Sequence, residues 1–123
     1  MTTPRRIFIV DDDQNSIALI TTLLEARGHT IRSNLVADQA ISQIVDMRPH
    51  IVLVDLMMAA LDGYALAGEL KRRPELSDTK VVMVSARTGA IWSERSKTAG
   101  LDGYVTKPID IATFAERVES FLP

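Results

Sequence analysis

The chain has 123 residues, of which 46% are hydrophobic and 24% charged, as expected of one globular domain with a single core. A net charge of −2 gives no electrostatic basis for direct nucleic-acid binding, and the lack of cysteine excludes disulfides, thiolate nucleophiles and zinc–thiolate sites. The apolar run near the N-terminus is too short for a signal peptide or membrane insertion, so we expect a cytoplasmic protein.

Strands and helices are expected to alternate along the chain. The first helix should stop near Gly28, where glycine suits a left-handed turn. Pro49 and Pro74 should end the second and third helices, and Asp110 should cap the last. The expected strands are Arg6–Val10, Thr30–Ser33, Ile51–Val54, Val81–Val84 and Gly103–Thr106. The helices are marked by Ile17, Ile20, Leu23 and Leu24; by Ala40, Ile41, Ile44, Val45 and Met47; by Leu66 and Leu70; by Trp92, in a poorly defined segment; and by Ile111, Phe114, Val118 and Phe121, expected to point inward.

Three of these strands are apolar at every position, as in IFIV, IVLV and VVMV. Such runs are typical of parallel strands that helices cover on both faces. Strands that alternate with helices form β–α–β units, which are almost always right-handed. The sequence therefore predicts an α/β fold in which residues 1–123 form one domain, either as a complete protein or as part of a longer one.

Polar side chains gather where the expected strands end. Asp11 and Asp12 follow the first strand, Asp55 the third, Ser85 the fourth and Lys107 the fifth. Parallel strands share one carboxyl edge, where ligands bind in α/β sheets. Carboxylates about 4 Å apart repel by roughly 4 kcal/mol at an effective dielectric near 20. Because Mg²⁺ takes carboxylate and phosphate oxygens, a magnesium site would remove this repulsion.

Asp55 is the strongest candidate nucleophile in the chain. A carboxylate can attack phosphorus and hold the phosphoryl group as an acyl phosphate. Lys107 would supply a mobile charge and Ser85 a hydroxyl donor. Each residue also has a simpler explanation: Ser85 as a turn cap, Lys107 as a surface lysine and Asp13 as the cap of the first helix. The convergence of Asp55, Ser85 and Lys107 at strand ends favours a phosphoryl site over these separate explanations. For Asp13 the helix cap remains the favoured explanation.

These motifs resemble the receiver domain of two-component response regulators. The resemblance covers the whole chain and rests on VDD at 10–12, VDLMMAALDG at 54–63, SA at 85–86 and GYVTKP at 103–108. It implies a flavodoxin-like, doubly wound sheet of five parallel strands in the order 2-1-3-4-5 with five helices.

The resemblance also implies a metal site. Asp55 would be the phosphoacceptor and a Mg²⁺ ligand. Asp12 would bind Mg²⁺ directly, Asp11 mostly through water, and Met57 through its backbone carbonyl.

The resemblance implies a switch as well. Ser85 and Lys107 would bind the phosphoryl oxygens, Tyr104 would be the aromatic switch residue, and the bond between Lys107 and Pro108 would be cis.

The sequence departs from the usual receiver pattern in two places. Ala59 stands where proline is usual, and Ile109 where phenylalanine is usual. Two further positions, Met57 and Arg87, flank the approach of hydrolytic water. Neither side chain can orient water as a base, so we expect slow self-dephosphorylation.

The expected function is a signalling switch, not a dedicated enzyme. A histidine kinase or histidine phosphotransfer protein would phosphorylate Asp55 and remodel the surface of the fourth helix, fifth strand and fifth helix. Output would go to a downstream protein or to an effector domain absent from this chain; homodimerisation on phosphorylation is open. One alternative is a small metal-dependent phosphatase with an aspartyl nucleophile. Another is a flavodoxin-like nucleotide or flavin binder, although the first turn, DDDQNS, lacks glycine.

Overall fold

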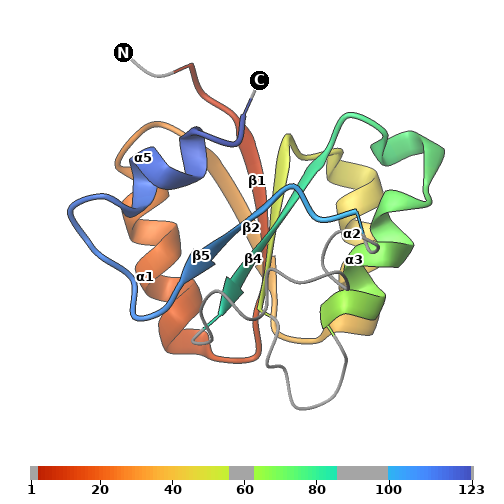
Figure 1. The fold of residues 1–123 in the computed structure, drawn as a ribbon, viewed down its shortest axis with the longest axis horizontal. Helices are drawn as coiled ribbons and strands as arrows, with labels where there is room; N and C mark the ends of the chain where they lie inside the picture. Colours follow the sequence, from red (N-terminus) through yellow and green to blue (C-terminus); the bar gives the residue numbers. More distant parts are fainter. Residues whose placement is uncertain (1–2, 56–62, 86–99, 123) are drawn as a thin grey trace.

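The computed structural model describes residues 3–55, 63–85 and 100–122, and its centre is a parallel sheet (Figure 1). The strand order β2-β1-β3-β4-β5 confirms the predicted flavodoxin-like topology. The strands are β1 Arg6–Val10, β2 Thr30–Asn34, β3 Ile51–Asp55, β4 Lys80–Ser85 and β5 Gly103–Thr106.

Helices cover both faces of the sheet. Figure 1 shows α1 and α5 on one face and α2 and α3 on the other. The described residues contain four α-helices and one short 3₁₀ helix, and the predicted helix near Trp92 lies outside them. Among the described residues, no helix is long and apolar enough to cross a membrane. The helices are α1 Gln14–Glu25, α2 Ala37–Met47, α3 Gly63–Lys71, η1 Pro74–Leu76 and α5 Phe114–Glu119.

Alternate residues of each strand feed two separate cores. Phe8 and Val10 of β1 point to the side of α2 and α3. Ile7 and Ile9 point to the side of α1 and α5. Each is at most 1% exposed, and burying one such side chain contributes about 1.5–3 kcal/mol. The inner positions of β1, β3 and β4 are buried on both sides and are apolar, whereas charged residues begin β1 and β4, at Arg6 and Lys80.

The ends of the helices follow local chemistry. The Asp13 side chain caps α1 by accepting a hydrogen bond from the Asn15 amide at 2.9 Å. The α1 helix ends at Glu25, and Gly28 adopts the left-handed conformation with φ of 91°. Arg48, with φ of 48°, ends α2 directly before Pro49. The predicted caps and stops therefore lie within a few residues of the observed helix ends.

The start of the last helix differs from its prediction. The helix α5 begins at Phe114 after Thr113, four residues beyond Asp110. The Asp110 side chain accepts the Ala112 amide at 3.0 Å and its carbonyl accepts the Phe114 amide at 2.9 Å, so Asp110 caps the turn that leads into α5. The side chain of Ile111 in this turn is 66% exposed, so the prediction that it points inward was wrong. Helical spacing cannot show that the chain enters the helix one turn later.

Candidate functional site

Strand register places the acidic residues at the same height in the sheet. Val10 of β1 pairs with Val54 of β3, so the residues that follow, Asp11 and Asp55, are level with each other. Ser85 of β4 pairs with Thr106 of β5, which directly precedes Lys107. The sheet thereby brings the predicted residues together at its carboxyl edge.

Three carboxylates form a compact cluster there. One oxygen each from Asp11, Asp12 and Asp55 lies within 4.8 Å of the others. Asp11 is 1% and Asp55 7% exposed, whereas Asp12 faces solvent. A hard, oxygen-preferring divalent cation fits this donor set, because it needs one or two carboxylates and keeps water on its open side.

The ammonium of Lys107 reaches into the cluster. Its Nζ lies 3.0 Å from Asp11 Oδ2 and 3.6 Å from Asp55 Oδ2. It also donates to Ser16 Oγ at 3.3 Å. Ser16 was missed in the sequence, where a serine in the first turn of a helix suggests only support for the cap. Because Ser16 and Lys107 are 91 residues apart, no local sequence pattern indicates their contact.

The pKa values of Asp11 and Lys107 are set by burial and by the charges beside them. Burial raises the pKa of Asp11 and the neighbouring Asp55 carboxylate adds to the rise, while hydrogen bonds from the Asp13 amide and from Lys107 oppose it. Burial also acts to lower the pKa of Lys107, but the hydrogen bond to Asp11 and the charges of Asp11 and Asp55 outweigh it, and that pKa is raised. Lys107 is therefore a fixed positive charge beside Asp55 at neutral pH.

Ser85 and Tyr104 lie near this edge. Ser85 is 3% exposed, and its carbonyl accepts the Lys107 amide at 2.7 Å. Tyr104 is half-buried against the core on the side of α2 and α3. The peptide bond between Lys107 and Pro108 is cis. Met57 and Arg87 lie outside the described residues, as does Ala59.

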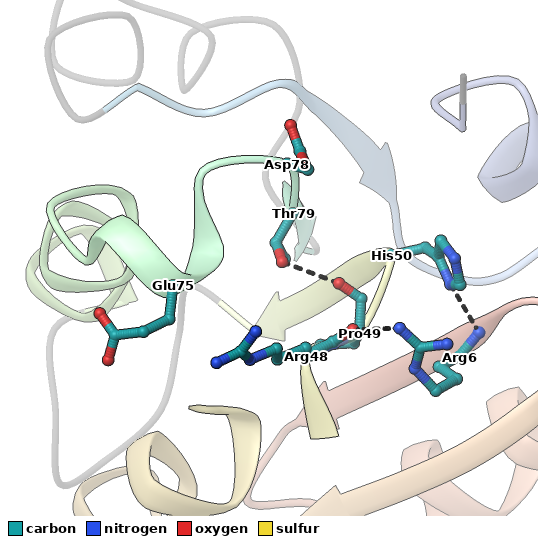
Figure 2. A pocket seen from close by; sticks show the side chains of 7 residues that line it. All are labelled: Arg6, Arg48, Pro49, His50, Glu75, Asp78 and Thr79. Carbon is teal, nitrogen blue, oxygen red and sulfur yellow. Dashed lines mark hydrogen bonds between the residues drawn. The ribbon is translucent and has the colours of Figure 1, made fainter. Parts of the chain in front are cut away.

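A hollow lies at the opposite, amino edge of the sheet (Figure 2). It has a volume of about 310 Å³. Thr79 Oγ1 donates to the Pro49 carbonyl at 2.8 Å within it. Its charges are mixed, with arginines and acids together, and the carboxylate cluster does not border it. The lining residues are Arg6, Arg48, Pro49, His50, Glu75, Asp78 and Thr79.

The doubly wound parallel sheet, with an acidic cluster and a lysine at its carboxyl edge, places the chain among the α/β domains that bind their ligands at this edge. The chain belongs to the response regulator receiver domain family, whose model matches residues 7–119. It is therefore a phosphorylation-activated signalling switch and not a dedicated enzyme, and the phosphatase alternative has no support.

Similar proteins agree with this family. The chain is 29% identical over 122 residues to Protein PilG of Pseudomonas aeruginosa, covering 96% of this chain and 90% of PilG. It is 30% identical to the polar-differentiation response regulator DivK of Brucella anthropi, with 97% of each chain covered. The chemotaxis response regulator CheY4 of Vibrio cholerae shares the fold, with a TM-score of 0.90 at 18% identity, over 98% of this chain and 100% of CheY4.

Proposed function

We propose that Asp55 accepts the phosphoryl group from the phosphohistidine of a histidine kinase or histidine phosphotransfer protein. The observation that carries this proposal is the position of the Asp55 carboxylate, which lies among two other carboxylates and 3.6 Å from the Lys107 ammonium. An Asp55 oxygen attacks phosphorus, and the bond between phosphorus and the donor nitrogen breaks. In this scheme the domain catalyses only its own phosphorylation and dephosphorylation.

The same residues would hold Mg²⁺ during transfer. Asp12 and Asp55 would supply carboxylate oxygens directly and Asp11 mostly through water, and we propose the Met57 carbonyl as a further ligand. The bound ion would neutralise charge on the phosphoryl oxygens. Lys107 would bind one of these oxygens from the opposite side, and the Ser85 hydroxyl another.

Phosphorylation would then change a surface of the domain. We propose that Ser85 moves toward the phosphoryl group and that Tyr104 turns inward, which remodels the surface around β5 and α5 for a downstream protein or an effector domain. Slow dephosphorylation, through Met57 and Arg87, remains a prediction.

Other predictions from the sequence also stay predictions. They are a cytoplasmic location, a single domain over residues 1–123, the lack of direct nucleic-acid binding and homodimerisation on phosphorylation.

Replacement of the phosphoacceptor tests the proposal. Incubation with acetyl phosphate and Mg²⁺ should add one phosphoryl group, seen by intact mass and mapped by peptide analysis to Asp55. Asp55→Asn is nearly isosteric and should abolish the labelling while leaving the fold intact. Chelation of Mg²⁺ should abolish it as well.

The matched control is Asp46→Asn, which changes an exposed aspartate on α2 and should be labelled like the wild type. Labelling of the Asp55→Asn variant at another carboxylate would overturn the assignment.

A further inference from the structure

The ammonium of Lys107 has three oxygen neighbours within the described residues. An ammonium carries three N–H donors. Two of the neighbours are carboxylates, Asp11 Oδ2 at 3.0 Å and Asp55 Oδ2 at 3.6 Å. The third is the hydroxyl of Ser16 at 3.3 Å, in the first turn of α1. This neutral contact comes from a residue outside the cluster of metal-binding carboxylates.

The direction of the Ser16 hydroxyl is defined by its second contact. Ser16 Oγ donates to Asp13 Oδ2 at 3.2 Å. A hydroxyl has one hydrogen and two lone pairs, so once it donates to Asp13 it can only accept from Lys107. Asp13 is itself held by the Asn15 amide at 2.9 Å. A continuous chain of hydrogen bonds thus runs from the start of α1 to the ammonium.

The three contacts respond differently to phosphorylation. The carboxylates of Asp11 and Asp55 would turn to the cation, and Asp55 would carry the phosphoryl group. Ser16 would bind neither the cation nor the phosphoryl group, so its contact with Lys107 can persist throughout the reaction. A lysine side chain loses rotamer entropy when it is held in one conformation, and a persistent acceptor reduces the entropy that it must lose when it binds the phosphoryl oxygens.

We propose that Ser16 is a positioning residue, which orients the Lys107 ammonium toward the phosphoryl group on Asp55. This inference rests on the proposed function. The competing explanation is that Ser16 only supports the cap of α1 through Asp13. The two explanations differ in whether the effect of Ser16 depends on Lys107.

An isosteric pair of variants isolates the hydroxyl. Ser16→Thr keeps the hydroxyl and should be phosphorylated by acetyl phosphate and Mg²⁺ within about twofold of the wild-type rate, whereas Ser16→Val, of the same shape, should be about fivefold slower. Ser16→Ala should be slowed like Ser16→Val. Ser42→Ala, at an exposed serine of α2, is the matched control and should keep the wild-type rate. Thermal melts would establish that each variant is folded.

A double-mutant cycle with Lys107→Ala decides between the two explanations. If Ser16 acts through Lys107, Ser16→Val should have no further effect on the slower rate of the Lys107→Ala protein. An equal fold-reduction in both backgrounds, or equal rates for Ser16→Thr and Ser16→Val, would overturn the inference and leave the proposed function standing. Failure of the wild type to be labelled at Asp55 would overturn both.

Discussion

At the residue scale, His50 shows how a hydrogen bond sets a protonation state. Its Nδ1 accepts the backbone amide of Arg6 at 3.0 Å, at the amino edge of the sheet (Figure 2). That nitrogen must therefore carry no proton. Burial lowers the pKa of His50, and the charges of Arg6 and Arg5 lower it further. The neutral ring of His50, the residue directly before β3, thus binds the start of β1.

The lowered pKa predicts how stability depends on pH. The contribution of His50 should be complete above the ordinary histidine pKa of about 6.5 and decline as the pH falls through that value, because the unfolded chain then binds the proton more readily. His50→Asn keeps an acceptor in place of Nδ1 but does not titrate. Urea unfolding at pH 8 and pH 5.5 should show a smaller loss of stability in His50→Asn than in the wild type. Equal losses would contradict this role.

At the element scale, the last helix is held at its C-terminal end. Arg27 pairs with both oxygens of Glu119 of α5, at 2.5 and 3.1 Å. Glu119 Oε2 also lies 2.8 Å from Nε2 of His29, whose side chain is fully buried. The hydrogen bond from Arg27 lowers the pKa of Glu119, with His29 contributing, so the carboxylate stays charged. These contacts tie α5 to the segment between α1 and β2.

The contact of β5 with the end of α5 predicts the effect of an added methyl group. A Cβ at Gly103 would overlap the ring of Phe121, over which the Arg117 guanidinium lies at 4.8 Å. Gly103→Ala should therefore destabilise the protein by about 1–3 kcal/mol in urea unfolding, the usual cost of overpacking. In a Phe121→Ala background the same change should cost less than half as much.

Gly68→Ala is the control for this prediction. Within the part of the chain that the structure describes, its added Cβ would meet only Arg72 Nη1 at 3.4 Å, and alanine favours the α3 helix, so stability should be unchanged or higher. A cost for Gly103→Ala that does not depend on Phe121 would contradict the overlap.

At the scale of the whole molecule, the carboxylate cluster links metal binding to folding. Asp11, Asp12 and Asp55 come from two strand ends and meet only in the folded chain. Without a cation their mutual repulsion opposes folding. A cation bound by the folded state alone would stabilise the protein by mass action.

This linkage predicts opposite effects of one variant in two buffers. In chelator, Asp12→Asn should melt at a higher temperature than the wild type, since removal of one charge relieves about 1 kcal/mol of repulsion. In Mg²⁺ the wild type should gain more stability than the variant. Asp46→Asn should follow the wild type in both buffers. Equal melting temperatures in chelator for Asp12→Asn and the wild type would argue against a strained cluster.

Much of the fold and site could be predicted from the sequence, because their signals are local. β1, β3 and β4 each contain an apolar run that is buried on both faces, and strand type follows from the run itself. Asp11, Asp55 and Ser85 lie where these runs end, and a parallel sheet must bring such ends to one edge. The same sequence determined the cap at Asp13, because a helix N-terminus needs an acceptor within a few residues.

Only the tertiary structure decided contacts between distant segments. The Ser16 hydroxyl meets Lys107 across 91 residues, and Arg27 meets Glu119 across 92. Periodicity shows which side of a helix faces the sheet, but not how far the helix is rotated or shifted along it. For the same reason Ile111 fits an inward pattern and is nevertheless exposed, since the chain enters α5 one turn later. These features depend on packing between elements, which no local pattern encodes.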